Sequence, residues 1–497
     1  MNRPLRALFV APELAPWVKA GGLAEVSRDL PRALADAGAD VRLLVPAFPA
    51  LRAAFPAARE RARFDAPGGS LAAARLLEAS ATPQIYLVEC DAYYARAGGP
   101  YGGPDDADWP DNHLRFGLLS RVAALLGSAA SPLAWRPDIV HCNDWPCGLA
   151  PAYLAHARGQ CAATVMTVHN LAYQGIFPRR ALEELALPHG SFAAEGLEYH
   201  GKLSFLKAGL HYATKLSTVS PSYAREILRP DLGFGLDGLL RRRAHDLAGI
   251  LNGIDTDTWN PARDPHLVSR YDAASLEAKR PNKSALQLEL GLPQDGDAPL
   301  LGMVSRLVAQ KGADLVIGIA AEIVRAGAQI AVLGSGERAI ENALLELAQR
   351  HSRAIAVRIG FSEPLAHRIE AGADVFLMPS RFEPCGLNQL YSMRYGTPPV
   401  VRRTGGLADS VVDAVAESQR AGTATGFVFD ESSPRALLGA LRRALAAARD
   451  PVVWSAIQRA GMAREAGWRR AAREYLELYR RALSGEKSPS PLRGGGP

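Results

Sequence analysis

The sequence predicts an α/β protein built from two Rossmann-like, doubly wound domains. Short apolar runs typical of buried strands alternate with segments of helical spacing along the whole chain. The alternation restarts after Asn252-Gly253, and a length of 497 residues exceeds the ~250–300 residues at which single cores stop growing. Glycine-rich turns also follow several apolar runs, at the places where an open α/β sheet binds ligands.

The first half of the chain opens with a strand, a helix and a second strand. The apolar run 6–10 predicts a buried strand, and residues 23–37 have helical spacing that ends at Gly38. The next strand, at 41–45, completes a βαβ unit, which implies parallel strands and a right-handed crossover. Further strand-like runs lie at 85–88, 139–141 and 163–168, and further helical stretches at 114–126 and 203–214.

The second half repeats this architecture. Its strand-like runs, separated by helical segments, are 299–305, 329–333, 355–359, 375–378 and 397–401. We expect one domain over 1–247 and another over 248–467, since Gly, Asp and Asn turn signals gather near that boundary. The final residues, 484–497, are rich in Ser, Pro and Gly, and such a segment buries too little apolar surface to order itself.

Bulk composition excludes several classes of protein. No run of about 18 uncharged apolar residues and no signal peptide is present, so we expect a cytoplasmic protein without a membrane partner. The five cysteines are scattered, without a C-x-x-C pair, as in a reducing compartment. A net charge of +6 is modest for this length, and no nucleic-acid motif accompanies it.

The most informative stretch runs from Pro379 to Tyr391, with the letters PSRFEPCGLNQLY. It places a lone carboxylate, Glu383, on a Pro- and Gly-containing loop between an apolar run and a helix start. A glycine-rich turn, Thr404-Gly-Gly-Leu-Ala-Asp409, follows shortly after. Such a loop, backed by helix amide groups, favours an anionic ligand. A carboxylate beside an anion site indicates sugar-nucleotide chemistry; a cap or plain loop residue is the alternative for Glu383.

Several motifs resemble those of bacterial glycogen synthases and plant starch synthases. Glu383-Pro-Cys-Gly-Leu and the turn after it match the C-terminal signature of that family, and Lys19-Ala-Gly-Gly-Leu-Ala-Glu25 matches the N-terminal one. The motifs between them are His141-Cys-Asn-Asp144-Trp, Thr167-Val-His169-Asn-Leu-Ala-Tyr-Gln-Gly175, Val219-Ser-Pro-Ser-Tyr223, Leu251-Asn-Gly-Ile-Asp255 and Val304-Ser-Arg306-Leu-Val-Ala-Gln-Lys311-Gly. All stand in the family's order, and the resemblance extends to about Tyr479.

The resemblance implies the GT-B fold, in which two Rossmann-like domains face each other across a cleft that holds the active site. The first domain is then the acceptor side, the second the nucleotide-sugar side, and a helix over 468–483 returns to the first domain. The implied reaction is the retaining transfer of glucose from ADP-glucose to the non-reducing end of an α-1,4-glucan such as glycogen, with release of ADP. The resemblance implies no cofactor, and no metal site is evident.

Five residues match the family's catalytic positions. The departing diphosphate gains negative charge as the anomeric bond breaks, so cations must stabilise it, and Arg306 and Lys311 match the cations that do so. Glu383 matches the carboxylate at the donor glucose, where it binds hydroxyl groups and stabilises an oxocarbenium-like transition state. His169 and Asp144, at strand ends, match residues near the transferred sugar; a buried structural histidine and a helix N-cap are the alternatives.

The resemblance also implies a set of donor-binding residues. Glycines before a helix let backbone amides approach a phosphate or a sugar hydroxyl closely. Lys19 resembles the family's N-terminal lysine, although this chain has Ala20 and Glu25 where Thr and Asp are common. Gly334-Ser-Gly-Glu337 is a weaker signal for the nucleotide pocket. The residues that we assign to ADP-glucose binding are Lys19, Gly21, Gly22, Tyr101, Asn252, Cys385, Gly386, Leu387, Thr404, Gly405 and Gly406.

Two other readings stay open at this point. Another GT-B activity would share the fold, although a phosphorylase needs a pyridoxal-binding lysine site that the sequence does not show. A non-enzymatic glycan-binding scaffold predicts the loss of charged residues such as Lys19, Arg306 and Glu383, yet all are present. The choice between ADP-glucose and UDP-glucose depends on pocket contacts that the sequence does not place. At Tyr391 many related enzymes have a second Glu, so ribose contacts must differ here.

Overall fold

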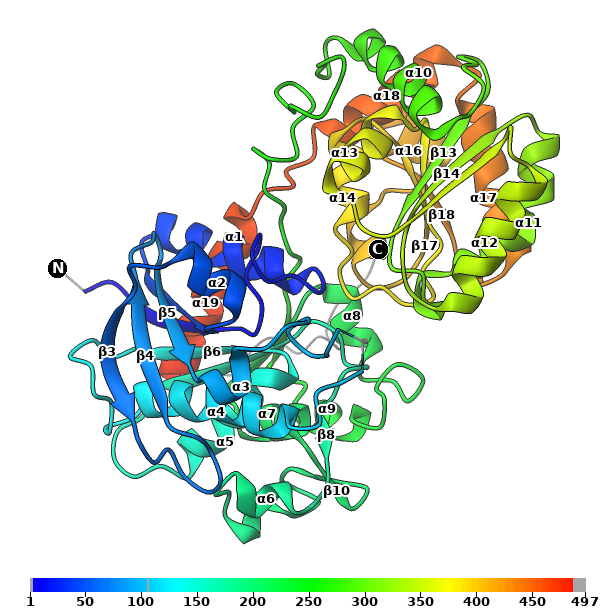
Figure 1. Ribbon diagram of the computed structural model, residues 1–497. Helices are drawn as coiled ribbons and strands as arrows, with labels where there is room; N and C mark the ends of the chain where they lie inside the picture. Colours follow the sequence, from blue (N-terminus) through cyan, green and yellow to red (C-terminus); the bar gives the residue numbers. More distant parts are fainter. Residues whose placement is uncertain (1–2, 105–106, 486–497) are drawn as a thin grey trace. The chain divides into compact units, whose positions relative to one another are not determined.

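The computed structural model describes residues 3–104 and 107–485, which form two compact units (Figure 1). Unit 1 comprises Met1–Asn252 together with Trp468–Pro497, and unit 2 comprises Gly253–Gly467. The first unit therefore ends a few residues beyond the position that the turn signals suggested. From residue 486 onward, the tail predicted at 484–497 lies outside the described residues.

Unit 1 is built on a mostly parallel sheet with the strand order β12-β11-β7-β6-β1-β2-β5-β4-β3. Its strands are β1 (Arg6–Val10), β2 (Asp40–Pro46), β3 (Arg59–Phe64), β4 (Ala74–Ala79), β5 (Gln84–Glu89), β6 (Ile139–Asn143), β7 (Ala163–Val168), β11 (Lys215–Thr218) and β12 (Leu247–Gly249). The hairpin of β3 and β4 is antiparallel and extends one edge of the sheet. The sequence analysis did not anticipate this hairpin, because the alternation of apolar and charged residues in 59–64 is masked by exposed arginines.

Helices flank this sheet on its two faces (Figure 1). The helices of unit 1 are α1 (Leu23–Asp36), α2 (Pro49–Ala54), α3 (Asp91–Tyr94), α4 (Asn112–Leu126), α5 (Leu149–Ala155), α6 (Ala181–Glu184), α7 (Phe205–Tyr212), α8 (Pro221–Glu226), α9 (Asp237–Arg242) and α19 (Arg469–Ser484). A small antiparallel ribbon adds β8 (Ile176–Phe177), β9 (Glu198–Tyr199) and β10 (Lys202–Ser204). The helix expected at 203–214 is therefore shorter, because its first residues pair in β10 and Ser204 caps α7 by accepting from the Lys207 amide.

The C-terminal helix α19 packs in the core of unit 1. Its buried residues recur at helical spacing, and they share a cluster with apolar side chains of β1, α1 and β7. The hydroxyl of Tyr479 lies 2.7 Å from Nδ1 of His141 on β6, and Nε2 of that ring lies 2.6 Å from Thr167 Oγ1. A polar chain thus joins α19 to two adjacent strands of the sheet.

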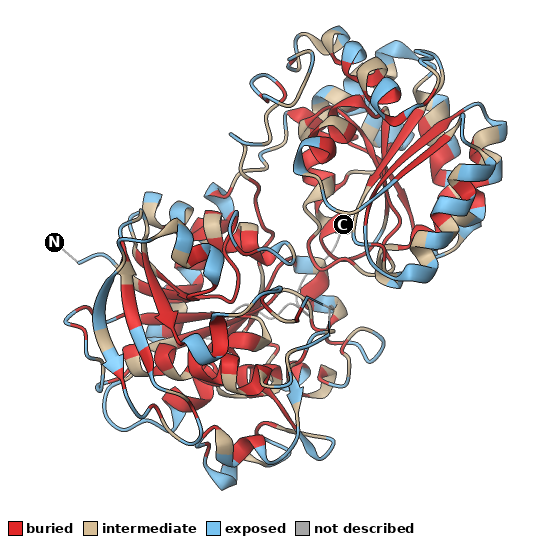
Figure 2. Cartoon of the chain, viewed as in Figure 1, coloured by how far each residue is buried: buried red, intermediate tan, exposed pale blue. Residues whose placement is uncertain are grey.

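Unit 2 contains a parallel sheet with the order β15-β14-β13-β16-β17-β18. Its strands are β13 (Leu300–Val304), β14 (Gln329–Gly334), β15 (Ile355–Ile359), β16 (Val375–Met378), β17 (Pro399–Arg402) and β18 (Phe427–Phe429), and its helices are α10 (Arg280–Leu290), α11 (Ala313–Arg325), α12 (Arg338–Arg350), α13 (Glu363–Gly372), α14 (Asn388–Arg394), α15 (Gly405–Ser410), α16 (Ala416–Arg420), α17 (Pro434–Ala447) and α18 (Pro451–Met462). Apart from the exposed last two residues of β15, these strands are mostly buried, as Figure 2 shows, which explains their apolar runs.

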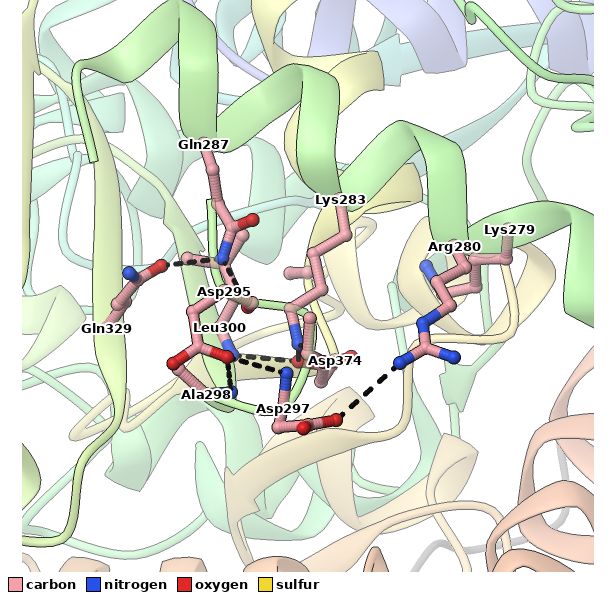
Figure 3. Close-up of polar contacts among 12 residues, drawn as sticks. Lys279, Arg280, Lys283, Gln287, Asp295, Asp297, Ala298, Leu300, Gln329 and Asp374 are labelled. Carbon is pink, nitrogen blue, oxygen red and sulfur yellow. Dashed lines mark hydrogen bonds and ion pairs between the residues drawn. The ribbon is translucent and has the colours of Figure 1, made fainter. Parts of the chain in front are cut away.

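A polar cluster fastens α10 to the amino-terminal edge of this sheet (Figure 3). Lys283 on α10 forms an ion pair of 2.7 Å with Asp374, which also accepts a hydrogen bond of 2.8 Å from the amide of Leu300. One turn further along α10, Gln287 donates to Gln329 Oε1 at 2.9 Å. These partners stand at the starts of β16, β13 and β14, so the cluster lies at the edge opposite the strand ends where ligands bind.

Both sheets reverse their strand order at a switch point. In unit 1 the chain leaves β1 on both sides, toward β2 and toward β6, and in unit 2 β13 has β14 and β16 as neighbours. Ligands of open α/β sheets bind beyond the carboxyl ends of the strands at such points. The two doubly wound sheets confirm the predicted α/β class. Among the residues that the structure describes, no helix is long and apolar enough to cross a membrane.

Candidate active site

In unit 2 the charged candidates gather beyond the carboxyl ends of β13 and β16. The ammonium of Lys311 lies 2.6 Å from Oε2 of Glu383, and the hydroxyl of Ser380 donates to the same oxygen at 2.9 Å. The Glu383 side chain is only 5% exposed, so it is held in place before any ligand arrives. An ammonium has three donors, and Glu383 is the one acceptor that the described residues give to Lys311.

The two loops that carry this pair are joined by their backbones. The amide of Arg381 donates to the carbonyl of Gln310 at 2.8 Å, and the Gln310 side chain donates to the carbonyl of Phe382 at 3.1 Å. Gly312 has φ +70°, and a Cβ there would lie 2.2 Å from the carbonyl oxygen of Pro379. A glycine is therefore required for the loops to meet. Arg306, on the loop after β13, is exposed to solvent.

The glycine pair after β17 packs against the Glu383 loop. A Cβ on Gly405, where φ is +43°, would lie 1.9 Å from the carbonyl oxygen of Glu383, and a Cβ on Gly406 would lie 2.0 Å from that of Cys385. The amide of Gly406 donates to the Glu383 carbonyl at 3.1 Å. These glycines allow a close backbone approach, and in this structure they pack against the Glu383 loop instead of facing open space.

The remaining candidates of unit 2 surround that loop. Gly386 has φ +71°, Cys385 and Thr404 are buried, and Leu387 directly precedes α14. Tyr391 on α14 stacks on Trp259 with the ring centroids 3.7 Å apart. The aromatic residue at this position is therefore part of the packing of unit 2.

In unit 1 the loop after β1 is organised by Glu13, a residue that the sequence analysis did not single out. Oε2 of Glu13 accepts from the amides of Ala20 at 2.7 Å and Gly21 at 3.1 Å, and Oε1 accepts from the Tyr101 hydroxyl at 2.6 Å. Burial raises the pKa of the Glu13 carboxyl, although these donors oppose that shift. The carboxylate thus binds Tyr101 to the turn that carries Lys19, whose ammonium forms an ion pair with Glu25.

These contacts change which backbone amides of this turn face a ligand. The amides of Ala20 and Gly21 already have an acceptor, whereas Gly22 and Leu23, at the start of α1, have none among the described residues. No atom lies within 4 Å of a Cβ built on Gly21. The first amides of α1 therefore provide the anion-binding dipole end next to an open glycine.

Asp144 and His169 lie together at the ends of β6 and β7. Oδ1 of Asp144 accepts from the His169 amide at 2.7 Å, and Asp144 has φ +56°, which is rare for a residue with a side chain. Its side chain makes no N-cap hydrogen bond. Burial raises the pKa of Asp144 to about 7 and lowers that of His169 to about 3. The imidazole is therefore neutral at pH 7, and its Nε2 lies 3.0 Å from Asn143 Oδ1.

Two further candidates of unit 1 have different surroundings. Tyr101 packs its ring against Phe116 and Trp145, with centroids 5.7 and 6.0 Å away. Asn252 follows β12 at the edge of the sheet and is buried, and its Oδ1 has no hydrogen-bond partner among the described residues. Tyr101 is therefore tied to the Lys19 turn through Glu13, whereas Asn252 follows a different strand at the edge of the sheet.

Phe361 is a second residue that the sequence analysis missed. It is 71% exposed directly after β15, and the preceding Gly360 donates its amide to the carbonyl of Gly334 at 2.9 Å. An exposed aromatic ring thus lies beside the glycine turn at the carboxyl edge of the sheet. The signal in the sequence was a lone aromatic residue after a strand, which by itself is too common to be informative. Within the described ranges, no group of three or more His, Cys, Asp or Glu side chains could hold a metal ion.

Comparisons with known proteins agree with this geometry. Residues 6–242 match the starch synthase catalytic domain, and residues 291–459 match glycosyl transferases group 1. The chain is 53% identical over 481 residues to a glycogen synthase of Dechloromonas aromatica, covering 97% of this chain and 99% of that protein. It is 54% identical over 478 residues to one of Aromatoleum aromaticum, covering 96% of each.

A solved structure is similar over nearly the whole chain. It is the catalytic domain of starch synthase IV from Arabidopsis thaliana bound to ADP and acarbose, with a TM-score of 0.86 and 29% identity, covering 97% of this chain and 100% of that one. Fold, strand-end residues and matched domains together define a glycosyltransferase of the GT-B class. Within that class, the chain belongs to the glycogen synthase family.

Proposed function

We propose that this enzyme transfers glucose from ADP-glucose to the non-reducing end of an α-1,4-glucan such as glycogen, with retention of configuration and release of ADP. The observation that carries the proposal is the Lys311–Glu383 pair, in which Glu383 is buried and Lys311 partly buried; it stands at the switch point of unit 2 with an exposed Arg306 on the adjoining loop. The relatives named glycogen synthase, and the ADP- and acarbose-bound starch synthase, support the choice of substrates.

The residues of unit 2 act on the donor. Arg306 and Lys311 offset the charge that develops on the diphosphate when the anomeric bond breaks, because cations held in place lower the energy of that state. Glu383, fixed by Lys311 and Ser380, accepts hydrogen bonds from glucose hydroxyls and stabilises the oxocarbenium-like centre. The exposed ring of Phe361 provides a face on which the adenine stacks.

The residues of unit 1 act on the transferred sugar and, through the Lys19 turn, on the anionic donor. Lys19 and the first amides of α1 contribute positive potential, and His169, neutral at pH 7 because burial lowers its pKa, offers polar groups without a competing charge. We assign no nucleophilic role to Cys385, which is buried on the Glu383 loop. Front-face attack, in which the leaving phosphate takes the proton of the acceptor hydroxyl, is therefore the mechanism that we propose.

The test is glucose transfer to glycogen from ADP-glucose and from UDP-glucose, with Glu383→Gln, Arg306→Ala and Lys311→Ala beside the wild type. Loss of one preorganised stabilising group lowers kcat by roughly 10²–10³-fold. Arg368→Ala is the matched control, since Arg368 pairs with Glu289 at 2.7 Å on the surface of unit 2 between α13 and α10, away from the strand ends. It should turn over like the wild type.

Each outcome decides a separate point. Transfer from ADP-glucose that is lost in Glu383→Gln establishes both the reaction and the role of the carboxylate. Equal transfer from UDP-glucose would contradict the donor assignment, and near-wild-type turnover in both cation variants would contradict leaving-group stabilisation. A cytosolic location is part of the same proposal and is supported by the five cysteines, all of which have free thiols.

A further inference from the structure

Glu13 is a buried carboxylate that has no part in the catalytic and binding roles proposed above. Only 3% of the residue is exposed, and its two oxygens receive three hydrogen bonds from two different segments of unit 1. Burying a charge is costly unless donors surround it, so this arrangement is maintained against a desolvation penalty. Both oxygens of Glu13 are already engaged by donors of the protein itself.

The local fold directs Glu13 toward the Lys19 turn. Leu14 and Val18 close a short hairpin through two backbone hydrogen bonds of 3.0 and 2.9 Å. This hairpin brings the chain back, so that Ala20 and Gly21 present their amides to the Glu13 carboxylate. Side-chain packing does not hold the turn at Gly21, because nothing lies within 4 Å of a Cβ there. The position of that glycine is therefore restrained by hydrogen bonds, one from its amide to Glu13 and one from the Ala24 amide to its carbonyl at 3.3 Å.

The second oxygen of Glu13 binds Tyr101, which comes from a separate loop. The Tyr101 carbonyl is held in turn by the Asn112 side chain at 2.8 Å and the Trp109 amide at 3.1 Å. Oε1 of Glu13 thus binds a segment anchored to α4, and Oε2 binds the turn that leads into α1.

We propose that Glu13 is a positioning residue for donor binding: it holds the Lys19–Gly21 turn and the Tyr101 hydroxyl in one arrangement, which leaves the Gly22 and Leu23 amides at the start of α1 for the anionic substrate. The proposal rests on the function proposed above. Its physical basis is preorganisation, because a turn fixed before binding loses less conformational entropy when the ligand arrives.

The test compares Glu13→Ala, Glu13→Gln and Tyr101→Phe by kcat, by KM for ADP-glucose and by calorimetric binding of ADP. Glu13→Ala should raise KM and the ADP dissociation constant about tenfold or more, with a smaller change in kcat, since a freed turn must be ordered at each binding event. Glu13→Gln should restore part of this loss, because its amide oxygen still accepts from the Ala20 and Gly21 amides. Tyr101→Phe should have a smaller effect, and adding it to Glu13→Ala should change little further.

Asp246→Asn is the matched control for mere destabilisation. Asp246 is a partly buried carboxylate in the same unit, paired with Lys215 at 2.9 Å and with Arg243 at 2.9 Å, and it precedes β12 at the opposite edge of the sheet. It should lower the unfolding temperature while KM stays unchanged. The proposal is overturned if Glu13→Ala loses stability as Asp246→Asn does but keeps the wild-type KM and ADP affinity.

Two further measurements distinguish a failure of the proposal from other causes of lost activity. If Glu13→Ala does not fold, Glu13→Gln decides: an intermediate rise in KM supports the proposal, and a wild-type KM contradicts it. Failure of the proposed function has a different signature, because the wild type itself would then transfer no glucose from ADP-glucose. Calorimetry with ADP on the wild type and the Glu13 variants would still measure how far Glu13 prepares the turn.

Discussion

The sequence Gly-Gly-Leu-Ala followed by an acidic residue occurs once in each unit, but the space around the glycines differs between the two copies. In unit 1 a Cβ on Gly21 meets no atom within 4 Å, and the buried carboxylate of Glu13 accepts a hydrogen bond from the Gly21 amide. In unit 2 a Cβ on Gly405 or Gly406 would lie about 2 Å from a carbonyl oxygen of the Glu383 loop. Gly21 leaves room for a ligand, whereas Gly405 and Gly406 make room for the protein's own backbone.

This difference separates two uses of glycine that look identical in a sequence. A glycine before a helix either lets a ligand approach the backbone or lets a second segment do so. In unit 2 the second segment carries Glu383, so we expect the pair to influence catalysis by fixing the position of that carboxylate. A substitution at the turn of unit 2 should therefore lower kcat and stability, whereas one at the turn of unit 1 should raise KM for the donor.

The largest effect is expected at Gly406→Ala. The new methyl group cannot be accommodated without moving the Cys385 carbonyl, so the Glu383 loop must shift, and a displacement near 1 Å costs on the order of 10²-fold in rate. We expect kcat to fall by about that factor and the unfolding temperature to drop. Turnover at the wild-type level would show that the loop tolerates the intrusion and that the comparison between the turns is mistaken.

Gly21→Ala should have an intermediate effect and spare the fold. With open space around the Cβ, the free energy of unfolding should change by no more than about 0.5 kcal/mol. If the donor approaches this turn closely, KM for ADP-glucose should rise about tenfold, which corresponds to about 1.4 kcal/mol of binding free energy. Steady-state kinetics and a melting curve on one preparation separate the two quantities. An unchanged KM would show that the donor does not approach this turn closely.

Glu25→Gln should have a smaller effect on the same turn. It releases Lys19 from its ion pair, and a partly exposed pair contributes only about 0–1 kcal/mol. We expect a change of about two- to fivefold in KM for the donor that shrinks as the salt concentration rises. A much larger change, insensitive to salt, would mean that Glu25 itself contacts the substrate.

The smallest effect on activity is expected at the amino-terminal edge of unit 2. Lys283→Met removes the ion pair with Asp374, whose geometry at 2.7 Å resembles that of Lys311–Glu383 at 2.6 Å. Because this pair fastens α10 and lies away from the strand ends, and because Lys283 is buried, stability should fall by about 1–3 kcal/mol while kcat and KM stay unchanged. A clear loss of activity would show that position on the sheet does not separate structural from catalytic pairs.

Strand-end residues could be predicted from sequence wherever an apolar run and a glycine turn bracket them. This holds for Glu383 after β16, Lys311 after β13 and His169 after β7. Glu13 and Phe361 could not be found in this way, because their importance lies in partners that are distant in the chain or in exposure, neither of which a linear pattern records. The antiparallel β3–β4 hairpin was missed for a similar reason: edge strands with charged residues lack a clean apolar run.

The sequence by itself determined the two doubly wound sheets and the order of the motifs, because periodic burial and turn chemistry are local properties of the chain. Only the tertiary structure decided what each polar group faces. It assigned the Ala20 and Gly21 amides to Glu13, the Gly406 amide to the Glu383 loop and Tyr391 to a stack on Trp259. Hydrogen bonds and close approaches of this kind join segments far apart in sequence, so they exist only once the strands have brought those segments together.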